Sequence, residues 1–284
     1  KIKINFSDLP LWFQNKAAFL SDFEKKQFLE NFHKEPNIHI VFKDETKLQK
    51  FEDKLLKTSK LSGFLLEKGN FRNRNSFVEG DWWVQDFSSF LPLYNFEEIN
   101  KNKLFLDACA APGGKAAALL LRQPNITLLA IDKQKSKISR LQENLRPFPQ
   151  AEIQQQDALQ AEKWWDGELF DAILCDTPCS ATGLIQKHPE VKINQNEKNI
   201  QTLVQTQQAL LKALWPLIRN GGFLLYSSCS ILPEENEQTI SQFLQTQAEA
   251  QMYTKDKRIQ TGQQTFIPSS SHTGGYVAII QKKR

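Results

Sequence analysis

Two short segments of this chain each place a cysteine among serine and proline residues. They read Asp176-Thr-Pro-Cys-Ser-Ala-Thr-Gly183 and Tyr226-Ser-Ser-Cys-Ser-Ile-Leu-Pro-Glu-Glu-Asn236, and each follows an apolar run of strand length. Cysteine usually serves as a small buried hydrophobe, and this interpretation suits Cys109 in a tight loop and Cys175 in a strand. Loops such as these need no thiol for packing, so we interpret Cys179 and Cys229 as reactive groups.

Two such thiols beside a carboxylate could activate a pyrimidine base. Carbon 5 of cytosine is a poor nucleophile, but a thiolate that adds to carbon 6 makes the ring enamine-like and able to attack a methyl sulfonium. Asp176 is placed to hold the nitrogen edge of the ring. The adduct must then lose its carbon-5 proton and release the enzyme, and a second thiol can assist that release.

A loop of small residues, Asp107-Ala-Cys-Ala-Ala-Pro-Gly-Gly-Lys115, precedes a predicted helix. Its glycines allow a tight turn and a close approach to a ligand, and the helix offers unpaired N–H groups. A P-loop would have Gly at the position of Cys109 and Ser or Thr at that of Ala116. The loop also lacks the GxGxxG spacing, so a nicotinamide cofactor is disfavoured.

Two further acids extend this cofactor site. Asp132 ends the next predicted strand, where an acid takes the ribose hydroxyls of a nucleoside. Asp157 follows the third strand and could accept from an adenine amino group. The loop and the two acids describe an adenosine cofactor without a long phosphate. S-adenosyl-L-methionine fits, with a different nucleotide as the alternative.

The elements that must position these residues begin at about residue 76. Alternating strand and helix patterns predict an α/β fold with an open, mostly parallel sheet and helices on both faces. In such sheets ligands bind beyond the carboxyl ends of the strands, and four of the strands are followed by Asp. The expected strands are 104–106, 128–131, 151–155, 170–175, 223–226 and 276–280, and the expected helices are 115–122, 136–145, 200–219 and 234–246.

We expect a small N-terminal α/β subdomain over residues 1–75 and interpret it as RNA-binding. Residues 76–284 are expected to form the main domain, the S-adenosylmethionine-dependent domain if the cofactor is as inferred. We expect helices within 1–35, a strand at 37–43, a charged helix at 46–57 and a polar segment around Lys68, Arg72 and Arg74. The alternative is that this part only packs on the main domain.

The bulk composition is that of an ordinary globular protein, with 284 residues, 40% hydrophobic and 24% charged. No apolar run reaches the roughly 20 residues of a membrane span, and the start, Lys1 to Phe6, does not have the longer apolar stretch expected of a signal peptide. We therefore expect a cytoplasmic protein without disulfides, without a metal because no second cysteine pair or histidine cluster exists, and monomeric. The sequence begins without Met, so we expect a trimmed form or a piece of a longer protein.

Three motifs, DACAAPGGK, DTPCSATGLIQKHPEVK and SSCSILPEENE, together resemble the signatures of the RNA (cytosine-5) methyltransferases. The likeness is greatest to the bacterial small-subunit ribosomal RNA methyltransferase B, the Fmu/Sun type, and covers roughly residues 76–284. The resemblance implies a Rossmann-like S-adenosylmethionine-dependent methyltransferase fold. It also implies an RNA substrate, with 5-methylcytosine formed in 16S ribosomal RNA.

Residue roles follow from the same resemblance. Cys229 would be the nucleophile, Cys179 would assist product release, and Asp176 would contact the target base. The cofactor would be bound by Ala108, Cys109, Ala110, Ala111, Pro112, Gly113, Gly114, Lys115, Asp132, Asp157 and Asp176.

The chain departs from the family pattern at a few positions. Gln186 and Lys187 stand where Arg is frequent, Ile193 where Trp is common, and Ser228 where Thr often precedes the cysteine. The N-terminal RNA-binding domain of many Fmu-type members has no counterpart in these residues. Trp82, Trp83 and the 187–188 region are candidate RNA contacts, because a splayed-out base can stack on an aromatic side chain.

Three other functions stay open. An exocyclic-amine methyltransferase would share the cofactor fold, although Asp176-Thr-Pro-Cys179 differs from the Pro-Pro-aromatic motif of those enzymes. A non-catalytic RNA-binding or ribosome-assembly factor could keep the fold alone. A 5-methylcytosine enzyme could also act on tRNA or another RNA.

Overall fold

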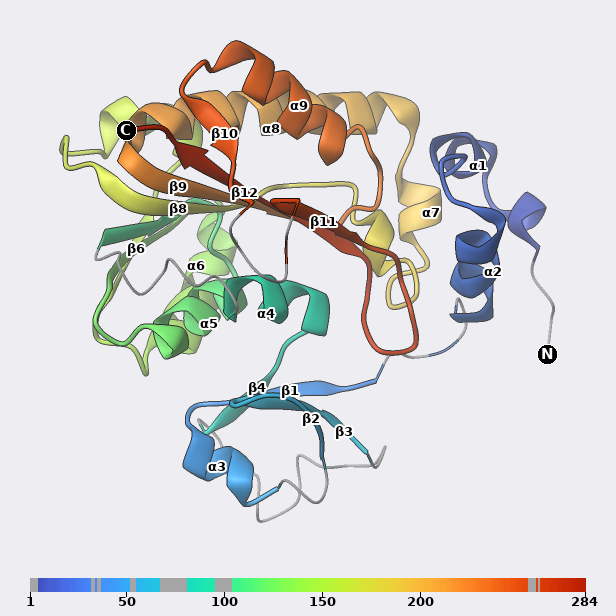
Figure 1. Ribbon diagram of the computed structural model, residues 1–284, viewed down its shortest axis with the longest axis horizontal. Helices are drawn as coiled ribbons and strands as arrows, with labels where there is room; N and C mark the ends of the chain where they lie inside the picture. Colours follow the sequence, from blue (N-terminus) through green and yellow to red (C-terminus); the bar gives the residue numbers. More distant parts are fainter. Residues whose placement is uncertain are drawn as a thin grey trace.

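The computed structural model describes residues 5–31, 34, 37–51, 55–66, 81–94, 104–254, 259 and 261–284. Within these ranges, a large sheet with helices on both faces occupies most of the molecule (Figure 1). A smaller sheet and a pair of N-terminal helices lie beside it (Figure 1).

The large sheet has eight strands in the order β10-β12-β9-β8-β5-β6-β7, with β11 paired to β12. Its strands are β5 Leu104–Asp107, β6 Thr127–Asp132, β7 Ala151–Gln155, β8 Phe170–Asp176, β9 Ile218–Ser228, β10 Ala250–Met252, β11 Gln263–Phe266 and β12 Gly275–Lys282. The five strands from β9 to β7 are parallel, whereas β12 runs antiparallel to β9. All six predicted strands are confirmed, and the mostly parallel α/β sheet with them.

Helices cover both faces of this sheet because successive strand residues point to opposite sides. Phe105 of β5 packs with Leu119 and Leu141 on the face of α5 Gly114–Arg122 and α6 Lys135–Leu145. Leu106 packs with Leu211 on the face of α8 Glu197–Leu214 and α9 Glu237–Thr246. The α4 helix, Phe87–Tyr94, lies on the α5 side (Figure 1).

Two helix predictions need correction at their ends. The helix predicted over 200–219 stops at Leu214, passes through a 3-10 turn at Trp215–Leu217 and gives way to β9 at Ile218. Pro216 in that turn lacks the N–H that would continue the helix. The helix predicted from 234 starts at Glu237, beyond Pro233. Neither β10 nor β11 was predicted.

The small sheet contains β1 His39–Phe42, β2 Leu55–Ser59, β3 Ser62–Leu65 and β4 Trp82–Val84, in the antiparallel order β2-β3-β1-β4. The strand predicted at 37–43 is confirmed as β1. The helix predicted at 46–57 is wrong in its second half, because α3 covers only Glu45–Gln49. Leu55 instead enters a strand and packs with Ile40 and Phe42 of the sheet's core. Lys68, Arg72 and Arg74 lie outside the described residues.

The small sheet contains strands from before and after the predicted boundary at 75/76, because β4 pairs with β1. The N-terminal helices, α1 Leu11–Lys16 and α2 Asp22–Asn31, do not pack in the core of the small sheet. Their residues Phe13 and Phe28 pack against Ile185 and Ile231, which follow the two cysteine segments. The predicted boundary at 75/76 therefore cuts through the small sheet, and the helices lie against the main domain.

None of the helices in the described ranges is long and apolar enough to span a membrane.

Candidate active site

The carboxyl ends of the parallel strands meet at one edge of the sheet. Asp107 at the end of β5 is in register with Leu174 of β8, and Asp176 at the end of β8 is in register with Ser227 of β9. A cavity of about 240 Å³ opens at this edge. Its lining comes from all the parallel strands' loops and from α8: Ala108, Cys109, Ala111, Asp132, Lys133, Gln134, Lys137, Asp157, Ala158, Leu159, Asp176, Thr177, Pro178, Cys179, Thr206, Leu210 and Cys229.

The predicted cofactor residues divide into two groups around this cavity. Those that line it are Ala108, Cys109, Ala111, Asp132, Asp157 and Asp176, whereas Ala110, Pro112, Gly113, Gly114 and Lys115 are not part of the lining. Gly113 instead makes the turn into α5, with a φ of 105° that disfavours any side chain. The loop therefore presents only some of its residues to the cavity.

The acids of the site are held by backbone N–H groups. Asp132 accepts from the N–H of Ala111 at 3.2 Å and from that of Gln134 at 2.8 Å. Asp157 caps the 3-10 turn that follows it by accepting from the N–H of Leu159 at 3.0 Å. These bonds fix both carboxylates at the cavity wall.

Cys179 and Cys229 converge at the same cavity, with their Sγ atoms 3.0 Å apart. They are 50 residues apart in sequence, and each follows the end of its strand, β8 or β9. The hydrogen bond between them raises the pKa of the Cys179 thiol and lowers the pKa of Cys229. The charge of Lys115 also lowers the pKa of Cys229, so this sulfur is the more nucleophilic of the two.

A lysine and a serine hold the neighbouring carboxylate. Lys115 Nζ lies 2.7 Å from Asp176 Oδ2, and the Ser227 hydroxyl donates to Asp176 Oδ1 at 2.9 Å. Asp107, almost fully buried beneath them, has its pKa raised to about 8 by burial and by the charge of Asp176. Lys115 therefore acts toward Asp176 and Cys229 from outside the cavity lining.

Two glycines let the cysteine loops approach closely. The N–H of Gly183 donates to the carbonyl of Cys229 at 2.9 Å, and the N–H of Gly274 donates to the carbonyl of Gly183 at 2.8 Å. A Cβ on Gly183 would lie 2.4 Å from the backbone of Gly274. Only glycine fits where these backbones cross.

Several residues at the site were not anticipated from the sequence. Lys133, Gln134, Lys137, Thr206 and Leu210 line the cavity, and Ser227 binds Asp176. The position of 133–137 directly after the Asp132 strand was an available signal. Thr206 and Leu210 gave none, because only the packing of α8 across the sheet brings them here.

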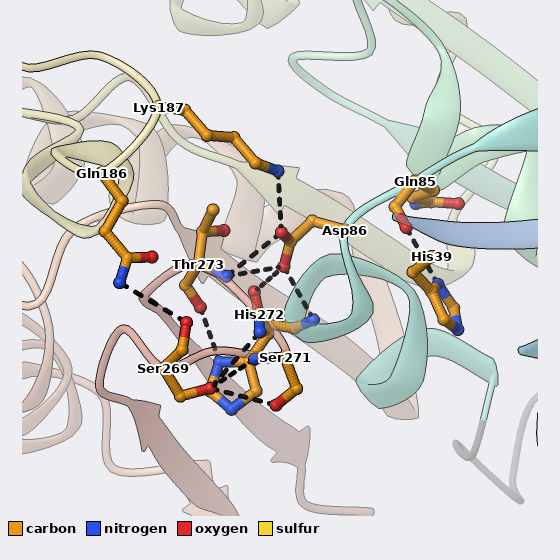
Figure 2. Close-up of polar contacts among 10 residues, drawn as sticks. His39, Gln85, Asp86, Gln186, Lys187, Ser269, Ser271, His272 and Thr273 are labelled. Atoms are coloured by element: carbon orange, nitrogen blue, oxygen red, sulfur yellow. Dashed lines mark hydrogen bonds and ion pairs between the residues drawn. The ribbon is translucent and has the colours of Figure 1, made fainter. Parts of the chain in front are cut away.

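The candidate RNA contacts are not part of the cavity lining. Trp82 and Trp83 are half-buried, Trp83 donating to Gln85 Oε1 at 3.1 Å. His188 is exposed and pairs with Glu190 at 3.0 Å. Lys187 is also exposed, and its ammonium lies 3.1 Å from Asp86 (Figure 2).

Asp86 is the centre of a joint between the small sheet and the main domain (Figure 2). Besides Lys187, its carboxylate accepts from the N–H of Thr273 at 3.1 Å and from the Ser88 hydroxyl at 2.8 Å. Thr273 directly precedes Gly274, one of the crossing glycines. The joint therefore connects β4 to the loops that carry the thiols.

No group of three or more metal-ligating side chains gathers among the residues that the structure describes.

The chain also matches a known protein family. The family model for 16S rRNA methyltransferase RsmB/F matches residues 96–281. The chain belongs to this family. The resemblance drawn from the three motifs is thereby confirmed.

Curated relatives carry the matching name. The ribosomal RNA small subunit methyltransferase B of Vibrio cholerae is 38% identical over 208 residues, which is 73% of this chain and 48% of that protein. Its namesake in Shewanella oneidensis is 46% identical over 154 residues, covering 54% of this chain and 36% of the relative. The chain thus matches about half the length of these relatives or less.

Solved structures show the same fold. NSun6 from Pyrococcus horikoshii, solved with SFG, superimposes with a TM-score of 0.79 at 17% identity, over 97% of this chain and 98% of that one. A methyltransferase homologue from the same organism gives 0.72 at 21% identity, covering 96% and 100% of the two chains. The fold is the Rossmann-like fold of S-adenosylmethionine-dependent methyltransferases, as predicted.

Proposed function

We propose that this protein methylates carbon 5 of a cytosine in RNA, with small-subunit (16S) ribosomal RNA as the substrate and S-adenosyl-L-methionine as the methyl donor. The observation that carries the proposal is the pair of thiols 3.0 Å apart at the wall of the cavity. Membership of the 16S rRNA methyltransferase RsmB/F family supports the same reaction and the same substrate.

The cavity suits an adenosine cofactor with a short charged tail. Asp132 lies at the end of the second parallel strand, where it can accept from ribose hydroxyls. Asp157 and Leu159 offer a carboxylate and an apolar wall for the adenine, and Ala108 and Ala111 leave space near the loop. When bound, S-adenosyl-L-methionine supplies an electrophilic methyl group.

Cys229 is assigned the attack on carbon 6 of the cytosine. Its sulfur has the lowered pKa of the pair, so it is the better thiolate. The new bond from sulfur to carbon 6 moves electron density to carbon 5, which then forms the bond to the methyl group. Cys179 remains a neutral thiol because its pKa is raised.

Asp176 is assigned the nitrogen edge of the base. The Lys115 ammonium and the Ser227 hydroxyl fix its two oxygens, so the carboxylate is already oriented when the base arrives. After methyl transfer a water molecule takes the carbon-5 proton, the electrons of that C–H bond re-form the double bond between carbons 5 and 6, and the C–S bond breaks to return the Cys229 thiolate. Cys179, 3.0 Å from the departing sulfur, can hydrogen-bond to it as the thiolate reforms.

The decisive experiment compares serine variants of the two cysteines. Cys229→Ser should abolish methylation of 16S ribosomal RNA, because a neutral hydroxyl does not add to carbon 6. Cys179→Ser should accumulate a covalent RNA–protein adduct, seen as a slower band on a denaturing gel. Cys175→Ala, in the buried part of β8, is the control and should methylate normally. Normal methylation by both serine variants would refute the scheme.

The RNA target and the modified atom need separate measurements. Bisulfite sequencing of ribosomal RNA and tRNA, with and without the protein, distinguishes a ribosomal target from tRNA. Mass spectrometry of the modified nucleoside distinguishes carbon 5 from an exocyclic amine. Action on ribosomal RNA would place the protein in the cytoplasm.

The small sheet and the joint at Asp86 are proposed to guide the RNA. Lys187 lies exposed beside the joint and offers a charge for a phosphate. The non-catalytic alternative, a ribosome-assembly factor, predicts RNA binding without any transfer of methyl groups.

A further inference from the structure

A fully buried carboxylate contacts the two cysteine loops and has no role in the proposed methyl transfer. Glu235 follows Cys229 by six residues, at the end of the loop that leads into α9. Its side chain is 0% exposed, and so are those of the residues around it, Ser180, Ser230 and Gln207. A carboxylate is costly to bury unless hydrogen bonds compensate it.

Four donors provide this compensation. Glu235 Oε1 accepts from the N–H of Ser180 at 2.8 Å and from the Gln207 side-chain amide at 3.1 Å. Oε2 accepts from the hydroxyls of Ser180 and Ser230, each at 2.5 Å. All four of these groups donate to the carboxylate, two to each oxygen.

These donors come from the residues next to the thiols. Ser180 directly follows Cys179, and Ser230 directly follows Cys229. One carboxylate therefore binds both cysteine loops, and Gln207 of α8 braces the arrangement by also donating to the carbonyl of Pro178 at 3.0 Å. The hydroxyl of Tyr226 donates to the Glu235 carbonyl at 2.6 Å and fixes the backbone of the acid itself.

We propose that Glu235 is a positioning residue that holds Cys179 and Cys229 at the separation the reaction needs. The inference rests on the proposed function for its consequence in catalysis. Its geometric part concerns the two thiols alone and can be tested without RNA.

The pKa of Cys229 distinguishes this positioning role from a direct effect of the Glu235 charge. The negative charge of Glu235 raises the pKa of both thiols. The hydrogen bond from Cys179 lowers the pKa of Cys229 by more. If Glu235 acted only by its charge, removing the charge would make Cys229 more acidic. If it acts by position, removing it loosens the thiol pair and makes Cys229 less acidic.

The test uses Glu235→Gln, with Glu237→Gln as the matched control. Glutamine keeps the shape of the acid but turns an amide donor toward a ring of donors. Glu237 lies two residues away and accepts from the Thr265 hydroxyl outside the thiol loops. Its substitution removes one negative charge from the same region and should leave the thiols unchanged.

Three measurements are made on each protein. The pH profile of Cys229 alkylation by iodoacetamide, followed by mass spectrometry, gives the pKa of the thiol. Trapping on RNA that contains 5-fluorocytidine gives the rate of adduct formation. Calorimetry with S-adenosylhomocysteine gives cofactor affinity.

We expect Glu235→Gln to shift the alkylation profile of Cys229 upward in pH and to slow adduct formation by about 100-fold, the effect of a displacement of about 1 Å. Cofactor affinity should stay within about threefold, because Glu235 does not line the cavity. Ser230→Ala, which removes one of the four donors, should move the profile in the same direction by less. This milder variant carries the test if Glu235→Gln does not fold.

An unchanged alkylation profile, or one shifted to lower pH, would overturn the proposal. So would an adduct rate equal to that of Glu237→Gln. If the unsubstituted protein forms no adduct with any RNA, the proposed function fails. The alkylation profiles would still decide whether Glu235 positions the thiols.

Discussion

At the scale of single residues, the two cysteines of the site show how surroundings assign roles to identical side chains. The same hydrogen bond lowers the pKa of Cys229 and raises that of Cys179. The charge of Lys115 adds to the first effect. The roles proposed for Cys229 as nucleophile and Cys179 as helper rest on this asymmetry around the pair.

Replacing Lys115 with glutamine tests this asymmetry. Lys115→Gln removes the positive charge that lowers the pKa of Cys229 and frees Asp176 from its ion pair. The alkylation of Cys229 should then shift to higher pH, and methylation should fall by about 100-fold or more, as for the loss of one preorganised charge in other active sites.

The control is Lys212→Gln, an exposed residue of α8 that does not line the cavity. It should leave both the alkylation profile and the methylation rate unchanged. A Lys115→Gln protein with the profile of the control would show that the lysine does not tune the thiol.

At the scale of elements, the small sheet contains a buried histidine whose protonation affects stability. His39 of β1 is 2% exposed and packs against Phe64 and Phe87. Its ring nitrogens contact the carbonyl of Gln85 and the Thr58 hydroxyl, both at 2.9 Å. Burial lowers the pKa of His39 to about 4, so the ring stays neutral in the folded protein.

This burial predicts acid sensitivity of the small sheet. In the unfolded chain His39 takes up its proton near pH 6.5, while the folded protein resists until about pH 4. Its contribution to stability is therefore complete above pH 6.5 and is lost as the pH falls toward 4. Linkage gives a loss of about 2 kcal/mol between pH 7.5 and pH 5.

His39→Phe provides the comparison. The variant should be less stable at pH 7.5, because the partners of both ring nitrogens lose their hydrogen bonds. Between pH 7.5 and pH 5 it should lose less stability than the unsubstituted protein does. Denaturant titrations at the two pH values measure the difference, and equal losses in both proteins would contradict the prediction.

At the scale of the whole molecule, Asp86 joins the small sheet to the catalytic loops (Figure 2). Burial alone would raise the pKa of this carboxyl, but the charge of Lys187 and the hydrogen bonds from Ser88 and Thr273 lower it overall. The ionised carboxylate thus ties its own segment to two distant ones, at Lys187 and Thr273, and the position of the small sheet is coupled to the loops that carry the thiols.

Asp86→Ala should loosen this joint and leave cofactor binding unchanged, because Asp86 does not line the cavity. We expect the amide of Thr273 and the strands of the small sheet to exchange hydrogen faster. The stability should fall by about 1–3 kcal/mol, since buried donors lose their acceptor. Hydrogen-exchange mass spectrometry measures the first effect.

A surface ion pair of the small sheet provides the control. Asp81 pairs with Lys47 at 2.9 Å, with both side chains partly exposed. Asp81→Ala should leave stability and exchange rates close to those of the unsubstituted protein, because an exposed ion pair contributes little. If Asp86→Ala exchanges no faster than this control, the joint does not hold the small sheet in place.

The sequence by itself determined the order of strands and helices in the main domain and indicated the loops for which we propose the chemistry. The period of its apolar runs sets the strands and helices, and glycine, proline and cysteine in three short motifs indicate the loops that carry function. All six predicted strands formed, and Asp132, Asp157 and the two cysteines came to one cavity. The strand ends and the loops that follow them are local features, because they depend on neighbouring residues, whereas the meeting of these loops at one cavity comes from the parallel order of the strands.

Only the tertiary structure decided what depends on distant residues. The place of β9 between β8 and β12 depends on pairing with both strands. β4 crosses the predicted domain boundary to pair with β1. Glu235 stands in one of the three motifs, but its complete burial among donors up to 55 positions away follows only from the fold. Pairings across such separations are set by packing and hydrogen bonding in the folded chain, which no local pattern encodes.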